Sequence, residues 1–111
     1  MEYILLGKTN LKVSRFCMGG CPMGGYGWGI VQKDELLYSI RSAIDEGVNF
    51  FDTADTYGMG QSEITLSEGL GTKRKDVVIQ TKFGVRIENG HTFYDNSPDY
   101  IETALNSSLK D

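Results

Sequence analysis

Three residues, Asp52, Tyr57 and Lys82, have the types and the spacing of a site that moves protons. Asp52 and Lys82 each follow a short apolar run, over 48–51 and 77–80, that is typical of a buried strand. Tyr57 lies in the segment after the first run. In a parallel α/β fold the loops that leave the carboxyl ends of the strands lie on one face, where active sites form. A lysine beside a tyrosine stabilises the phenolate and a carboxylate orients the lysine, so together they predict reduction of a carbonyl group.

Each of these side chains has a simpler interpretation when it is taken alone. Asp52 could cap a loop, the Tyr57 ring could be half-buried with its hydroxyl in water, and Lys82 could be a solvated charge. The three in this order favour catalysis. Ser62 and Glu63 are interpreted as structural, because Ser62 is placed to cap the following helix and Glu63 to favour its positive end.

Strands and helices alternate along the chain and place the candidate residues at strand ends. The pattern predicts a β-hairpin over 3–14, with turn residues at its centre. Three strand–helix units follow, over 16–46, 48–70 and 77–110. The polar segment 84–96 inside the last unit is predicted to be a loop.

The helices are predicted from the spacing of apolar residues and from the residues at their ends. Apolar residues recur at helical spacing from about Lys33 to Glu46 and from about Gln61 to Leu70. A third helix is expected to open at Ser97, with proline at its first position, where a missing N–H costs little. Helices alternating with strands indicate an α/β fold, a parallel sheet of right-handed crossover units.

The chain has 111 residues, too few for a closed (β/α)₈ barrel, which needs roughly 200 residues or more. Three units leave two open strand edges and one uncovered face of the sheet. Open edges are templates for pairing with another chain. We therefore expect either that the polypeptide continues past Asp111 or that this single partial domain, 1–111, associates with itself or with a complementary barrel half.

Charge and composition argue against several classes of partner. The net charge is −4 and the longest basic run is Lys73–Lys75, so nucleic-acid binding is not expected. No apolar run approaches the roughly 18 residues of a membrane helix, and the start lacks the pattern of a secretory signal. We expect a cytoplasmic protein that binds no membrane, with Cys17 and Cys21 reduced. Because His91 is the only histidine and is distant from them in sequence, no metal site is predicted.

The motifs of this chain, taken in order, resemble the amino-terminal part of an aldo-keto reductase, and the resemblance covers essentially all 111 residues. The matching stretches are Leu6-Gly7-Lys8-Thr9, Leu11-Lys12-Val13-Ser14, Gly47 to Ala54, Tyr57-Gly58, Gly60-Gln61-Ser62-Glu63 and Asp76 to Gly84. The resemblance implies a (β/α)₈ TIM barrel closed at its bottom by the amino-terminal hairpin. This chain would supply three of its eight units and stop before strand four.

The resemblance also implies NADPH-dependent reduction of an aldehyde or ketone, with Asp52, Tyr57 and Lys82 as catalytic residues. Tyr57 would donate a proton to the carbonyl oxygen while NADPH delivers hydride to the carbon. Lys82 would stabilise the phenolate, and Asp52 would pair with Lys82 and could also touch the nicotinamide ribose. The family's fourth catalytic residue, a histidine at the end of strand four, would lie beyond Asp111. His91 does not take that role, because it precedes the third helix.

The glycine-rich segment 19–29 matches neither the P-loop nor the dinucleotide fingerprint. In the family the loop after the first strand lies near the nicotinamide, so Gly20 and Cys21 are the implied cofactor-binding residues. They depart from the family's pattern, which usually has a threonine and then a large residue there. Tyr26 and Trp28 either line the rim of a substrate pocket or are exposed rings on a flexible lid.

Three functions are consistent with these observations. The first is an NADPH-dependent reductase of a small-molecule carbonyl compound, of which this chain is one part and without activity when isolated. The second is a non-catalytic fragment that associates through its open strand edges. The third is a binding or regulatory protein on the same scaffold. The sequence identifies neither the substrate nor the preference between NADPH and NADH.

Overall fold

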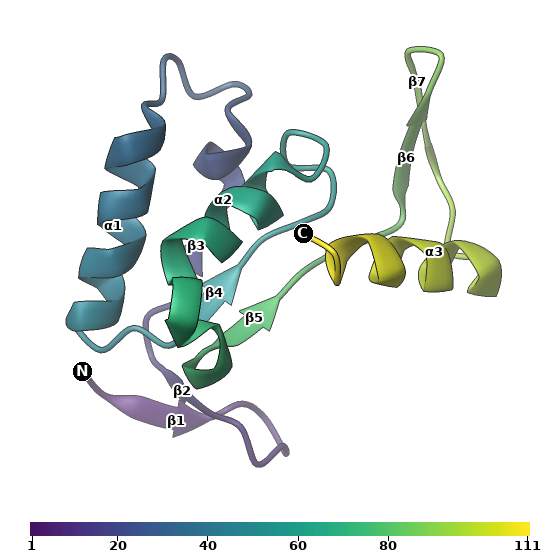
Figure 1. Cartoon of the computed structure of the whole chain (residues 1–111). Coiled ribbons are helices and arrows are strands. Elements are labelled where there is room, and N and C mark those ends of the chain that lie inside the picture. The colour runs from purple at the N-terminus through teal and green to yellow at the C-terminus, as the bar shows by residue number, and fades with distance from the viewer.

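The computed structural model describes residues 1–111 and has a three-stranded parallel sheet at its centre (Figure 1). The strands are β3 (Met18–Gly19), β4 (Phe50–Asp52) and β5 (Val78–Gln80), in the order β3-β4-β5. Helix α1 (Lys33–Asp45) connects β3 to β4, and α2 (Gln61–Leu70) connects β4 to β5. The predicted α/β alternation and parallel pairing are therefore present, and both helix predictions match to within one residue.

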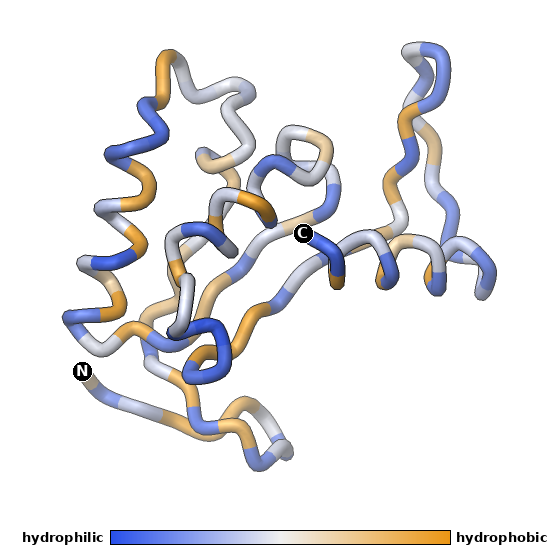
Figure 2. Tube along the Cα trace, in the orientation of Figure 1, coloured by the Kyte–Doolittle hydropathy of each residue, from blue (hydrophilic) through white to orange (hydrophobic).

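Apolar side chains between the two helices and one face of the sheet form the core. Phe51 of β4, Ile40 of α1 and Leu66 of α2 are almost fully buried there. Figure 2 shows the apolar residues of α1 on the side of that helix turned toward α2. The helices approach closely at Gly69, where a Cβ would lie 2.6 Å from Ile40 Cδ1. Glycine is therefore required at Gly69 for this packing.

The amino-terminal hairpin, β1 (Tyr3–Leu5) with β2 (Lys12–Ser14), is attached below the sheet, at the end of β4 that is remote from Asp52 (Figure 1). Asn49 makes the attachment, because its amide nitrogen donates to Lys12 O at 3.0 Å and its side-chain oxygen accepts from Ser14 N at 2.6 Å. The predicted hairpin is confirmed. The two hydrogen bonds of the Asn49 side chain fix the start of β4 against the hairpin, and so the register of the residues that follow.

The first strand of the sheet is displaced from the predicted position. The first strand–helix unit was predicted to begin at Phe16, whereas β3 consists of Met18 and Gly19. The chain bends just before it, since the Ser14 hydroxyl donates to Phe16 O at 2.6 Å. Pairing with β4 can begin only after that bend, at Met18 opposite Phe51.

The prediction that 84–96 is a loop was wrong. This segment forms an antiparallel hairpin of β6 (Val85–Glu88) and β7 (His91–Tyr94), which projects from the rest of the molecule in Figure 1. Its turn consists of Asn89 and Gly90, with φ of 51° and 76°. Two successive residues with positive φ are what a type I′ turn requires, and Asn-Gly is its preferred sequence.

Helix α3 (Pro98–Ser108) follows the hairpin and begins where the sequence predicted. The Ser97 hydroxyl accepts from Tyr100 N at 3.3 Å, and Asp95 accepts from Ser97 N at 2.9 Å while pairing with Arg86 at 2.8 Å. Two short 3₁₀ helices, η1 (Cys21–Gly24) and η2 (Gly71–Asp76), complete the structure. The two edge strands of the sheet, β3 and β5, are not joined, so the barrel is not closed.

We expect the junction between β7 and α3 to loosen in acid. Hydrogen bonds from the Ser97 hydroxyl and N–H, and then from Arg86, lower the pKa of Asp95 from 3.8 to about 2. A carboxyl whose pKa is lowered on folding contributes stability above its unfolded value, and the contribution is lost as pH falls from 3.8 through about 2. NMR of the Ser97 amide should show this titration, and Asp95→Asn should abolish it. An amide that does not titrate in this range would contradict the prediction.

No helix of this structure is both long enough and apolar enough to cross a membrane. The longest helix, α1, has 13 residues.

Candidate active site

The structure brings Asp52, Tyr57 and Lys82 together at the carboxyl ends of β4 and β5. Asp52 is the last residue of β4, and Lys82 lies two residues beyond β5. Lys82 Nζ donates to Asp52 Oδ2 at 2.7 Å, lies 3.4 Å from the Tyr57 hydroxyl oxygen and is 5.0 Å from the Tyr57 ring centroid. The expected proximity is therefore present, while the catalytic roles of the three residues stay a prediction.

The electrostatics of the site keep Lys82 protonated. Partial desolvation alone would lower the Lys82 pKa, but hydrogen bonds to Asp52 and Tyr57 and the charges of those two groups outweigh it, and the net shift is upward. The lysine side chain is 44% exposed and the Asp52 side chain 27%, so solvent screens the pair. The cation therefore remains beside the phenol across the physiological range.

The pairing of β4 with β5 explains why these side chains meet. Asp52 lies opposite Gln80, and alternation along a strand puts Lys82 on the same face as Gln80. The pairing continues beyond the strand ends, since Thr53 N donates to Gln80 O at 2.8 Å. Lys82 Nζ also donates to Thr53 O at 2.9 Å, which gives the ammonium a second fixed acceptor.

Sequence reasoning missed Gln80, whose side chain is part of this arrangement. Its amide nitrogen donates to Asp52 Oδ1 at 2.9 Å, while Lys82 occupies Oδ2. The signal was present in the sequence, because Gln80 precedes Lys82 by two residues in a strand. Only the register with β4, however, identifies Asp52 as its partner.

Three glycines allow the loop after β3 to pack directly on the loop that carries Tyr57. Gly20 N donates to Asp52 O at 2.6 Å. A Cβ on Gly24 would lie 2.7 Å from Gly58 N, and a Cβ on Gly58 would overlap the Gly24 carbonyl oxygen. The two loops are thus in backbone contact, and this contact limits where Tyr57 can lie.

Ser62 does not cap α2, contrary to the sequence-based interpretation. The residue preceding that helix is Gly60, and no side chain caps it. Ser62 is instead fully buried, where its hydroxyl donates to Gly20 O at 2.7 Å and shares a hydrogen bond of 2.8 Å with the Thr53 hydroxyl. The close approach of Gly20 supplies a carbonyl that only the folded structure reveals. Ser62 therefore connects the loops after β3 and β4.

Glu63 lies in the first turn of α2, as expected, but it has a further contact. It is 8% exposed and accepts a hydrogen bond of 2.6 Å from the Thr81 hydroxyl. Burial, and then the negative charge of Glu63, raise the pKa of nearby Asp55. This buried carboxylate joins α2 to the residue preceding Lys82.

The two residues implied to bind a cofactor have different surroundings. Gly20 uses its N–H for Asp52 and its carbonyl for Ser62, so its polar atoms are engaged inside the protein. Cys21 begins η1 and is half-buried. Cys17 lies just before β3 and is exposed. Partial desolvation of its thiol, and then the negative charge of Asp52, raise the pKa of that thiol. Gly20 itself is buried, so contact of this residue with a cofactor stays a prediction.

The outer part of the glycine-rich loop, residues 25–29, is exposed. Tyr26 is 87% exposed and Trp28 59%. Gly25, Gly27 and Gly29 all have positive φ and have open space where a Cβ would lie. A position at the rim of a substrate pocket remains a prediction for the two rings.

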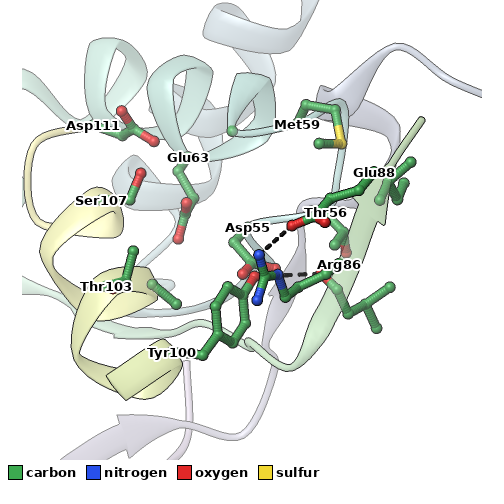
Figure 3. A pocket seen from close by; sticks show the side chains of 14 residues that line it. Asp55, Thr56, Met59, Glu63, Arg86, Glu88, Tyr100, Thr103, Ser107 and Asp111 are labelled. Atoms are coloured by element: carbon green, nitrogen blue, oxygen red, sulfur yellow. Dashed lines mark hydrogen bonds and ion pairs between the residues drawn. The ribbon is translucent and has the colours of Figure 1, made fainter. Parts of the chain in front are cut away.

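A cavity of about 280 Å³ (Figure 3) is lined by residues near the candidate site but by none of Asp52, Tyr57 and Lys82. Asp55 and Met59 from the Tyr57 loop, Arg86 from β6 and Tyr100 from α3 line it. Arg86 is paired with Glu88 and Asp95 and lies over the Tyr100 ring, 4.9 Å from its centroid. The charge of this arginine is thus neutralised within the cavity wall.

Comparison with known proteins identifies the class to which this fold and this arrangement belong. The sequence model of the aldo/keto reductase family matches residues 15–111. The chain therefore belongs to the aldo/keto reductase family, a family of oxidoreductases, and the resemblance seen in the sequence motifs is confirmed.

Particular relatives match nearly the whole chain. It is 32% identical to the aldo-keto reductase YhdN of Bacillus subtilis, over 99% of this chain and 34% of the relative. It is 35% identical to the L-galactose dehydrogenase of Arabidopsis thaliana, again over 99% of this chain and 34% of the relative. The chain thus spans about a third of the length of the curated relatives that it matches.

Solved structures of the same family superpose on the chain. An aldo-keto reductase from Bacillus halodurans in its holo form gives a TM-score of 0.86 at 28% identity, covering 99% of this chain and 36% of that one. The glycerol dehydrogenase of Gluconobacter oxydans gives 0.81 at 31% identity, covering 97% and 35%. The separate hairpin, sheet and helices thus have the arrangement of one part of these enzymes.

Proposed function

We propose that this chain forms the amino-terminal part of an NADPH-dependent reductase of small aldehydes or ketones. The observation that carries the proposal is the position of Lys82 Nζ, 2.7 Å from Asp52 and 3.4 Å from the Tyr57 hydroxyl. A phenol next to a fixed ammonium is a proton donor whose conjugate base is stabilised. Family membership supports the same chemistry.

Tyr57 is the proposed general acid, which donates its hydroxyl proton to the carbonyl oxygen of the substrate. Lys82 remains protonated and stabilises the phenolate that is left, because charge that develops during a reaction is stabilised by a cation already in place. Asp52 holds Lys82 at this position through their ion pair.

Bound NADPH would supply the hydride that reduces the carbonyl carbon. The residues present fit such a group at Asp52, whose carboxylate is partly exposed and able to accept from a ribose hydroxyl. Of the two residues implied by the family resemblance, the half-buried Cys21 is proposed to contact the nicotinamide side. The buried Gly20 is proposed to hold the start of that loop through its hydrogen bonds with Asp52 and Ser62.

We also propose that residues 1–111 are one partial domain, the hairpin and three βα units of a (β/α)₈ barrel. The open edges of β3 and β5 support this, because a parallel sheet is normally covered and extended on both sides. The coverage of about a third of each relative is consistent with three of eight units.

The test compares the protein purified from its natural source with the 111-residue chain. We expect the natural protein to consume NADPH in the presence of a panel of small aldehydes and ketones, and the chain alone to consume none above a blank without protein. The physical reason is that the chain has a proton donor but an open, incomplete surface around it. Two results would contradict the proposal: a natural protein inactive with the whole panel, or steady turnover by the isolated chain.

A further inference from the structure

The Asp52 carboxylate is held at both of its oxygens by side chains of one neighbouring strand segment. Lys82 Nζ donates to Oδ2 at 2.7 Å and Gln80 Nε2 donates to Oδ1 at 2.9 Å. The β4–β5 register sets Gln80 directly opposite Asp52. Only the lysine belongs to the proposed proton-donating arrangement, which leaves the contribution of Gln80 to be explained.

We propose that Gln80 is a positioning residue, which fixes the orientation of the Asp52 carboxylate so that Oδ2 faces Lys82. Its meaning for catalysis rests on the proposed function. The positioning itself is a property of the folded chain and is testable without a cofactor or substrate.

The physical argument begins with the freedom of a carboxylate. The last torsion of an aspartate side chain has a broad, roughly two-fold preference, so one partner fixes it poorly. The Asp52–Lys82 pair is also partly exposed, and such pairs gain little when both side chains are free to move. A second donor on Oδ1 restricts this torsion and so keeps Oδ2 directed toward Lys82 Nζ.

The chemistry of an amide suits this position. Its N–H group donates to the carboxylate without adding charge, so the ion pair remains one anion and one cation. A glutamate in place of Gln80 would put a second carboxylate against Asp52, and an apolar residue would donate nothing. Because the Gln80 amide is neutral, it does not compete with the Lys82 ammonium for the negative charge of Asp52. The second acceptor of Lys82, Thr53 O, is a backbone atom.

The test is the titration of Lys82 in the 111-residue chain, followed by NMR of lysine labelled at Cε. Gln80→Met keeps the length of the side chain and removes the donor. We expect it to lower the Lys82 midpoint by about half a pH unit, since loss of a hydrogen bond of ordinary strength weakens the ion pair by a comparable amount. Gln32→Met, at an exposed glutamine before α1, is the matched control and should leave the midpoint unchanged.

A double-mutant cycle separates positioning from a general structural effect. In an Asp52→Asn chain, Gln80→Met should have no further effect on the Lys82 midpoint, because the carboxylate it positions is gone. An equal shift in both backgrounds, or no shift in either, would overturn the proposal. Exchange of the Lys82 ammonium protons at neutral pH gives a second readout, and it should quicken in Gln80→Met only when Asp52 is present.

These outcomes are independent of the outcome for the proposed function. A natural protein that consumes no NADPH would refute the reductase and leave the Lys82 titration unaffected. A titration unaffected by Gln80→Met would refute the positioning role in a protein that still reduces carbonyl compounds.

Discussion

Tyr57→Phe is expected to lower turnover by about 10²- to 10⁴-fold in the active protein while leaving NADPH binding almost unchanged. The substitution removes the hydroxyl that lies 3.4 Å from Lys82 Nζ and keeps the ring over which the ammonium lies. The lost interaction is one that matters in the transition state, so it affects kcat more than the affinity for cofactor. Steady-state kinetics and a fluorescence titration with NADPH measure the two quantities.

Tyr38→Phe is the matched control, because Tyr38 is 73% exposed on α1 and its hydroxyl has no contact with the site. It should leave turnover unchanged. If Tyr57→Phe weakened NADPH binding as much as it slowed turnover, the hydroxyl would be a structural or cofactor-binding group and the proposed general acid would have to be sought elsewhere.

Gly58→Ala is expected to destabilise the chain by about 2–5 kcal/mol. Gly58 has φ of +66°, a conformation that costs an alanine about 1–2 kcal/mol, and the new Cβ would overlap the Gly24 carbonyl oxygen. Neither backbone can yield easily, because Gly20 nearby is bonded to Asp52 and to Ser62. Urea unfolding of the 111-residue chain gives the change in the free energy of unfolding.

Gly27→Ala separates backbone strain from overlap. Gly27 has φ of +79° and open space where its Cβ would lie, so it carries the conformational cost alone. The difference between the two variants is the free-energy cost of forcing the two loops apart. If Gly58→Ala and Gly27→Ala lowered the free energy of unfolding equally, the two loops would separate at no cost and their contact would not fix Tyr57.

The sequence was most informative where one local pattern decides the outcome. The bounds of α1 and α2 followed from apolar spacing and from the glycines that end them, and α3 began at the predicted Ser97 cap. Asp52 and Lys82 were placed correctly at strand ends, because short apolar runs reveal where buried strands stop.

The errors arose where the outcome depends on pairing partners. The β6–β7 hairpin was missed, although Asn89-Gly90 is its turn signal and Val85 to Glu88 alternate apolar with polar residues, because four residues are too short a run to stand out from a polar loop and β7 does not alternate. Ser62 was assigned to a cap from its place in the sequence, whereas its acceptor, Gly20 O, lies 42 residues earlier. Gln80 was missed since register, not pattern, pairs it with Asp52.

The contact between Gly24 and Gly58 also divides the glycine-rich loop by how freely it can evolve. Residues 20–24 lie against the Tyr57 loop, and a side chain at Gly24 or Gly58 would meet backbone, so a change at one position cannot be offset by a smaller residue at the other. Beyond them, Gly25, Gly27 and Gly29 have open space where a Cβ would lie. The exposed rings of Tyr26 and Trp28 can therefore be exchanged without meeting backbone, whereas a side chain at the glycines around them still carries the cost of a positive φ. Changes at these two exposed rings would leave the backbone contact beside Tyr57 intact.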